Sequence, residues 1–157
     1  MAQFVANRCH VPHAGQSASA TTALRHYEAA CALHTEPFLT EDLYADWSLI
    51  QREQLTQMYL TMCRALSLHA LDRGNFEEVL TWSTMMLQEN RCDEAAYRLL
   101  MRAYMATGRR AEALRLYQRC AQTLETELGI HPAPETTILF NAIVNYTPLP
   151  GVDEPGA

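Results

Sequence analysis

The sequence contains one pattern twice, and the interval between the two copies is the interval from Gly74 to Gly108. The same shift places Arg64 on Arg98. Four further pairs have the same spacing: Leu66 and Leu100, Glu78 and Glu112, Leu80 and Leu114, and Gln88 and Gln122. A period of about 34 residues is typical of repeats built from one helix–turn–helix unit, because a single unit cannot bury its apolar face alone. The repeat therefore predicts helical hairpins in tandem.

The second copy matches the residue pattern of the tetratricopeptide hairpin. Its consensus positions hold aromatic and apolar residues: Tyr97, Leu100, Met101, Tyr104, Ala113 and Tyr117. The first copy is degenerate at the same positions: Cys63, Leu66, Ser67, Ala70, Val79 and Ser83. Neither copy has the closing proline, since Arg91 and Glu125 occupy its place. We therefore predict an all-α, tetratricopeptide-like right-handed stack of about three helical hairpins with a C-terminal capping helix.

Prolines and capping residues indicate where the helices begin and end. A first helix over about 22–33 is followed by Pro37, which cannot follow a helical residue easily, and a long helix is expected over about 43–71. Asn75, with Glu78 three residues later, resembles a capping box at the start of the next helix.

The second hairpin and the capping helix have their own boundary signals. Asp93 is the expected N-cap of one helix, and Gly129 is expected just after the end of the next. Pro134 suits the first turn of the last helix. The apolar residues expected to cover the end of the stack are Ile138, Leu139, Ile143 and Val144. We expect an irregular lead-in over 1–21, a helical domain over 22–146, and a flexible tail or linker over 147–157.

The charge distribution argues against a nucleic-acid-binding module. The net charge is −6, and all 12 basic residues are arginine. Residues 91–119 carry seven arginines against three acids, whereas the segments before and after are acidic. DNA-binding modules are usually basic overall. We expect no direct DNA binding by this chain alone, although one basic group could touch phosphate if another domain held the duplex: Arg109, Arg110, Arg115 and Arg119.

No motif indicates catalysis, a cofactor or a metal. The sequence has no GxSxG, HExxH or phosphate-binding glycine loop. Cys9, His10 and His13 form one metal-like group, which we interpret as accidental because no fourth ligand has a usual spacing. Five cysteines without a CxxC pair are typical of thiols in a reducing cytoplasm, and neither a secretory signal nor a membrane span is evident. A non-catalytic cytoplasmic protein without a cofactor is the expectation.

The order of these features resembles the bacterial transcriptional activator domain. The resemblance extends from about Thr22 to Val144 through EPFLTEDLYADW (36–47), QREQLTQMYL (51–60), RGNFEEVL (73–80), TGRRAEALRLY (107–117) and LETELGIHPAPET (124–136). It implies a helical module that follows a winged helix-turn-helix in antibiotic-pathway regulators of actinomycetes, and that mediates self-association and contacts with the transcription machinery. The lead-in before the helical domain is too short for a winged helix-turn-helix, so we expect this chain to lack the DNA-binding domain, as a piece of a longer regulator or as a stand-alone relative.

The candidate partner-contact residues come from two patterns. The first helix of each pair lines the concave side of such a repeat, which selects Arg64, Arg98 and Arg102, with Tyr97 nearby. The basic group adds Arg109 and Arg110. Such a groove could hold an acidic peptide or a C-terminal carboxylate. Alternatively, the arginines pair locally, since Glu94 lies four residues before Arg98 and Glu112 lies three before Arg115.

The expected function is that of a non-catalytic interaction or oligomerisation domain of a bacterial transcription regulator. Its expected partners are RNA polymerase, the regulator's own DNA-binding domain, or a second copy of the chain. Two alternatives remain open: a tetratricopeptide adaptor for a peptide unrelated to transcription, and a helical domain that senses a small molecule.

Overall fold

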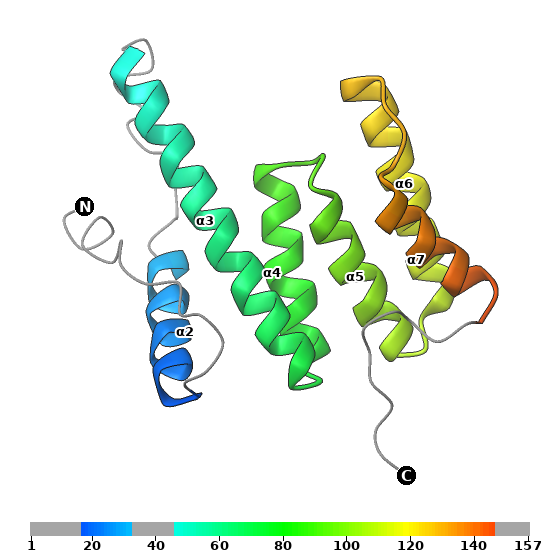
Figure 1. Cartoon of the computed structure of the whole chain (residues 1–157), viewed down its shortest axis with the longest axis horizontal. Helices are drawn as coiled ribbons and strands as arrows, with labels where there is room; N and C mark the ends of the chain where they lie inside the picture. Colours follow the sequence, from blue (N-terminus) through cyan, green and yellow to red (C-terminus); the bar gives the residue numbers. More distant parts are fainter. Residues whose placement is uncertain (1–16, 33–45, 147–157) are drawn as a thin grey trace. The chain divides into compact units, whose positions relative to one another are not determined.

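The computed structural model of the chain is helical throughout the part it describes, residues 17–32 and 46–146. In order, the helices are α2 (Ser17–Ala32), α3 (Asp46–Asp72), α4 (Phe76–Glu89), α5 (Glu94–Ala106), α6 (Arg110–Leu128) and α7 (Pro134–Val144) (Figure 1). No strand occurs in these ranges. The predicted all-α class is confirmed.

The first helix begins earlier than its pattern indicated. It starts at Ser17, so residues 17–21 of the expected irregular lead-in are helical. The long helix ends at Asp72, one residue beyond its expected end. The expectations for Pro37, for the tail over 147–157 and for the Cys9, His10 and His13 group lie outside the described residues.

The chain divides within α3 into two units, residues 1–66 and 67–157. In the first unit, α2 and α3 bring two thiols together. The Sγ atoms of Cys31 and Cys63 are 3.8 Å apart, and both residues are buried. Ala30 and Leu60 are buried in the same unit. The two cysteines therefore contact each other in a predominantly apolar setting.

In the second unit, the repeat is preserved in the backbone of two turns. After α3, the N–H of Gly74 donates to the carbonyl three residues back at 3.0 Å, and the next N–H donates to the carbonyl five residues back at 2.9 Å. After α5, the same two bonds recur at Gly108, with lengths of 3.0 and 2.7 Å. The φ angles are +71° and +73°, a region where glycine is favoured because it has no Cβ. Both turns are Schellman motifs, which confirms the glycine register of the repeat.

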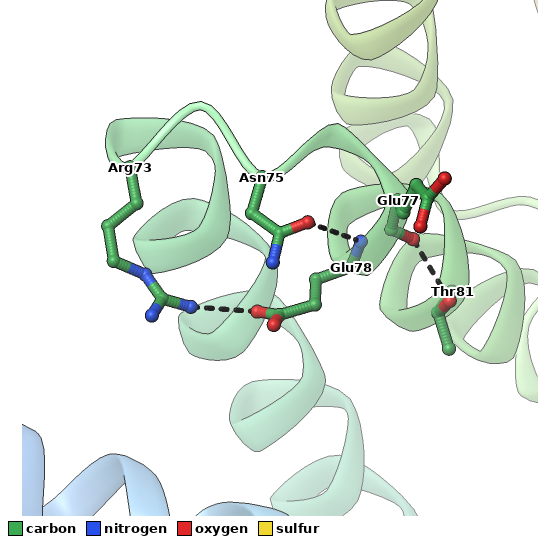
Figure 2. Close-up of polar contacts among 5 residues, drawn as sticks. All are labelled: Arg73, Asn75, Glu77, Glu78 and Thr81. Carbon is green, nitrogen blue, oxygen red and sulfur yellow. Dashed lines mark hydrogen bonds and ion pairs between the residues drawn. The ribbon is translucent and has the colours of Figure 1, made fainter.

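The capping residues hold their predicted places, with one difference at α4. The Oδ1 of Asn75 accepts a hydrogen bond from the backbone N–H of Glu78 at 3.4 Å (Figure 2). The carboxylate of Glu78 pairs with Arg73 at 2.8 Å, whereas a full capping box would direct it to the Asn75 N–H. That N–H already donates to Ala70 in the Schellman turn, so only half of the box forms. Asp93 caps α5 as predicted, accepting from two backbone N–H groups.

Helix α5 is central to the core of the second unit. One cluster of buried residues joins the end of α3, α4 and α5: Ala70, Val79, Leu99 and Ala103. Another joins α5, α6 and α7: Met101, Ala113, Leu139 and Ile143. Burying the larger of these side chains stabilises a fold by about 1.5–3 kcal/mol each. Removal of α5 would therefore expose both clusters.

The predicted capping helix is present as α7, but it buries a narrower face than expected. Leu139 and Ile143 are 2% and 0% exposed, as predicted. Ile138 and Val144, which we also expected to face inward, are 57% and 40% exposed. A helix that covers the end of a stack contacts it through one stripe only, and positions four apart lie on that stripe.

The degenerate positions of the first copy form a polar contact inside the hairpin. Ser67 and Ser83 are both fully buried, and their hydroxyl oxygens are 3.3 Å apart. Their counterparts one repeat later are Met101 and Tyr117, which belong to the apolar cluster of α5, α6 and α7. In the first copy, two small hydroxyl groups that hydrogen-bond to each other take the place of the larger side chains in the second copy. The two copies therefore share their backbone geometry but differ in how their side chains pack.

Candidate functional site

Residues of α4, α5 and α6 line a groove of about 680 Å³. These three helices follow one another in the second unit (Figure 1). Its floor is α5, which contributes Tyr97, Leu100 and Tyr104. Leu87 on α4 and Leu116 on α6 extend this apolar strip to the two walls. The volume lies within the range of about 300–1,000 Å³ that is typical of ligand sites.

Polar side chains flank the apolar strip. Gln88 on α4 and Gln122 on α6 are repeat-related, and both line the groove. Arg91, just after α4, and Arg119 on α6 bring positive charge to the groove, and Glu127 brings one negative charge. Five lining residues thus combine two amides, two guanidinium groups and one carboxylate around a hydrophobic floor.

Tyr97 is the most buried polar residue of the lining. It is 3% exposed and packs with Cys120 and Leu124. It lines the groove, and no hydrogen bond to its hydroxyl is found among the described residues. The hydroxyl oxygen is not among the buried polar atoms that lack a partner, so it reaches solvent and is available to a molecule in the groove.

Three thiols with raised pKa values lie in the described chain, two of them next to the groove floor. Burial raises the pKa of Cys120 to about 12. Burial and the nearby Glu127 carboxylate raise the pKa of Cys92, whose Sγ lies 3.6 Å from that carboxylate. A hydrogen bond with Cys63, together with burial, raises the pKa of Cys31. A thiol needs a lowered pKa to act as a nucleophile at neutral pH, so these three do not have that chemistry.

The structure gives the six predicted contact residues different roles. Arg98 donates from Nη1 to the Thr136 hydroxyl at 2.9 Å. That hydroxyl donates to Oε2 of Glu94 at 2.6 Å, and the same oxygen accepts from the backbone N–H of Ala133 at 2.9 Å. Glu94 and Arg98, expected as a local ion pair, therefore meet at Thr136. Together they hold the start of α7 against α5.

Arg110 holds the other end of α7. Its Nε donates to the carbonyl oxygen of Ile143 at 3.0 Å, and Nη2 donates to that of Val144 at 2.9 Å. The guanidinium group also lies 4.2 Å from the centroid of the Tyr146 ring. A positive charge at the C-terminal end of a helix stabilises the unpaired carbonyls of its last turn. The structural role of Arg110 is to cap α7.

The other arginines of the predicted set lie elsewhere. Arg109 is half exposed, 3.5 Å from Glu112, and its guanidinium carbon lies 4.6 Å from the Tyr104 ring centroid. Arg102 is partly buried on α5. Arg64 is exposed on the part of α3 that belongs to the first unit. Of the six predicted residues, Tyr97 is the one that lines the groove.

Sequence reasoning did not name Arg91 as a contact residue, and it placed Arg119 only in the basic group, because it assigned the lining to the first helix of each hairpin. The walls of the groove are second helices, α4 and α6. The signal that could have identified them is the pair Gln88 and Gln122, which has the repeat spacing and lies on those two helices.

Among the described residues, no group of three or more His, Cys, Asp or Glu side chains is placed to hold a metal ion. In the same part of the chain, no helix is both long and apolar enough to cross a membrane.

Helical hairpins with repeated Schellman turns, closed by a helix held at both ends, define a tetratricopeptide-like repeat module. The family model for the bacterial transcriptional activator domain matches residues 2–144. The chain belongs to that family, which confirms the resemblance of its motifs. A search of curated proteins found no match.

A solved structure with a similar fold is that of Mycobacterium tuberculosis EmbR in complex with a low-affinity phosphopeptide. The sequences are 25% identical, the TM-score is 0.74, and the match covers 94% of this chain and 39% of that one. The chain therefore matches less than half the length of EmbR. The tetratricopeptide-like class is confirmed, and this domain is of the type found in bacterial transcription regulators.

Proposed function

We propose that the chain is a protein-docking domain of a bacterial transcription regulator, acting through the transcription machinery or through the regulator's own DNA-binding domain. The match to the activator-domain family over residues 2–144 is the observation that carries this proposal. The groove between α4, α5 and α6 supports it, because an apolar strip between amides and charges suits a protein segment.

The charges favour a protein partner over direct contact with DNA. The net charge is −6, so the chain as a whole is repelled by a duplex. Within the basic segment 91–119, Arg98 and Arg110 are bonded to α7. They do not belong to a free cationic stripe along a surface, which is what phosphate binding requires.

The test is a binding measurement with the purified chain immobilised on a biosensor. RNA polymerase core, the holoenzyme and the winged helix-turn-helix domain of a family regulator are passed over it separately. We expect one of them to be retained with a Kd in the range of about 1–10 µM, as is common for regulatory contacts that bury a modest area. Sedimentation velocity of the chain alone measures self-association, which is the remaining route to a regulatory contact.

The control is an unrelated tetratricopeptide protein of similar net charge on the same sensor. Absence of retention together with a monomeric chain would contradict the proposal. Retention of a short DNA duplex by the chain alone at physiological salt would contradict the assignment to protein partners.

A second candidate function is the sensing of a small molecule in this groove, which is more open to solvent than the enclosed pockets of most such sites. Thermal unfolding in the presence of a panel of nucleotides and metabolites tests it. A ligand that raises the Tm, with loss of the shift in the Tyr97→Phe variant, would support it, and a flat panel would remove it.

A further inference from the structure

We propose that the groove between α4, α5 and α6 is the docking site itself, and that its occupant is an acidic segment of a partner protein with an apolar side chain next to the acid. This inference rests on the proposed docking function and adds the place and the chemistry of the contact. Three observations carry it: two arginines of the groove have no partner among the described residues, two glutamines line the groove, and the Tyr97 hydroxyl is accessible there.

The arginines of segment 91–119 divide into two groups. Five already have an interaction partner, and four of these partners are described residues: those of Arg98, Arg109, Arg110 and Arg115. The fifth arginine is Arg102. For Arg91 and Arg119, no hydrogen bond or ion pair with a described residue is found, and both line the groove. The two guanidinium groups without a contact in this part of the molecule are thus the two that a groove occupant can reach. A carboxylate is their natural complement, because it accepts paired hydrogen bonds from the guanidinium group.

The groove has one glutamine on each of the two helices that flank α5. Gln88 on α4 and Gln122 on α6 are one repeat period apart, so they have equivalent positions in successive hairpins. Each amide has donors and an acceptor, and can pair with the N–H and C=O groups of an extended backbone. This arrangement suits an extended peptide, whose main chain presents both kinds of group along its length.

The floor supplies the apolar contact and one more donor. Leu100 is 4% exposed and Tyr97 is 3% exposed, yet both reach the groove. The Tyr97 hydroxyl, to which no described residue is bonded, can donate to a carboxylate or a carbonyl of the occupant. In a segment with an acidic residue next to an apolar one, the apolar side chain would contact the floor and the carboxylate would bind the arginines.

The carboxylate of Glu127 makes the two arginines unequal. It lies 3.6 Å from the Sγ of Cys92, the residue next to Arg91, and therefore offsets the positive charge at that end. Arg119 is on α6, eight residues before Glu127. We therefore expect Arg119 to contribute more to binding than Arg91 does.

The experiment uses the full chain as bait for a phage library of random peptides of about 12 residues, a length that spans such a groove when extended. The selected peptides are expected to be enriched in Asp or Glu next to a leucine or an aromatic residue. The best peptide is then synthesised with a fluorophore, and its Kd is measured by anisotropy. We expect Arg119→Glu to weaken binding by at least about tenfold, Arg91→Glu by less, and Tyr97→Phe by about threefold, since each removes a charge-assisted or neutral hydrogen bond.

The matched control is Arg115→Glu, which changes the same charge on the same helix outside the groove lining, and should leave the Kd unchanged. Circular dichroism of each variant verifies the helical fold. No enrichment of acids, or equal weakening by Arg115→Glu and Arg119→Glu, would overturn the inference.

The outcomes separate this inference from the proposed function. If the acidic peptide binds in the groove but the chain is monomeric and retains neither RNA polymerase nor a winged-helix domain, the groove assignment stands and the regulatory function fails. If a regulatory partner is retained equally well by the wild type and the Arg119→Glu variant, the function stands and the groove assignment is wrong.

Discussion

Replacing Arg110 by methionine tests whether this arginine acts in folding or in partner contact. Its side chain donates to the carbonyl oxygens of Ile143 and Val144 at 3.0 and 2.9 Å, and lies 4.2 Å from the Tyr146 ring centroid. Methionine has a similar helix propensity and an unbranched stem, but it has no donor and no charge. The substitution therefore removes the contacts of the guanidinium group and retains most of the packing of the stem.

The expected loss follows from these contacts. Two partly exposed hydrogen bonds contribute about 0.5–1 kcal/mol each, toward the lower end of the usual range. The charge at the end of α7 adds about 0.3–1 kcal/mol. Because Tyr146 is 76% exposed, its ring contact adds about 0.5 kcal/mol at most. We expect the Arg110→Met variant to lose about 2 kcal/mol of unfolding free energy.

Urea unfolding followed by circular dichroism measures this loss, and hydrogen exchange of the α7 amides locates it. The control is Arg109→Met, one residue earlier, where the contacts are Glu112 at 3.5 Å and the Tyr104 ring at 4.6 Å on a half-exposed side chain. Such surface contacts contribute less than about 1 kcal/mol. Equal losses in the two variants, or faster exchange spread evenly over all helices, would refute the view that Arg110 fastens α7.

Three further predictions concern the repeat and its core. Gly74→Ala and Gly108→Ala should each lower the free energy of unfolding by about 1 kcal/mol, because φ is positive at both sites while the added Cβ would meet no atom of another part of the chain within 4 Å. Urea unfolding measures both losses, and unequal losses would contradict the equivalence of the two turns. Ser67→Ala should cost about 1–2 kcal/mol, because it leaves the buried Ser83 hydroxyl without its partner, and the double variant with Ser83→Ala should cost less than the sum of the two single changes. Cys120 should resist alkylation at pH 8 until urea unfolds the chain. Its pKa rises from 9.0 to about 12 on folding, so its contribution to stability should be complete below pH 9 and should decline as the pH rises toward 12. Urea unfolding at a series of pH values measures this decline.

The parts of the fold that were predictable from the sequence depend on local signals. The turn glycines, the N-caps Asn75 and Asp93, and Pro134 act within a few residues of their own position. A regular repeat period then needs no further information to place successive hairpins, because each unit contacts only its neighbours. For this reason the repeat register and the last helix agree with the structure.

The roles of the arginines were not predictable in the same way. Arg98 bonds to Thr136, 38 residues later, and Arg110 bonds to Ile143, 33 residues later. Both contacts exist only after α7 has packed on the end of the stack. A sequence pattern on one helix cannot show whether a cation faces solvent or the next helix, and charge pairing at spacings of three or four residues is weak enough to be replaced. Glu94 illustrates this, since it accepts from the start of α7 at 2.6 and 2.9 Å.

The position of the groove was predictable only in part, because the consensus positions of the hairpin describe its floor and not its walls. Consensus positions of the hairpin describe the side chains that pack inward, so they predict Tyr97 and Leu100 as buried, and both are. No consensus position lies on the faces of α4 and α6 that flank α5, so the consensus does not predict which residues line the groove there. Positions one period apart on α4 and α6 are nevertheless equivalent, and Gln88 and Gln122, which have this spacing, both line the groove. In a protein of this type, equivalent polar residues on successive second helices are therefore the sequence signal for a groove wall. The arginines that line the groove are those left without contacts, within the described residues, once the capping helix has bonded Arg98 and Arg110.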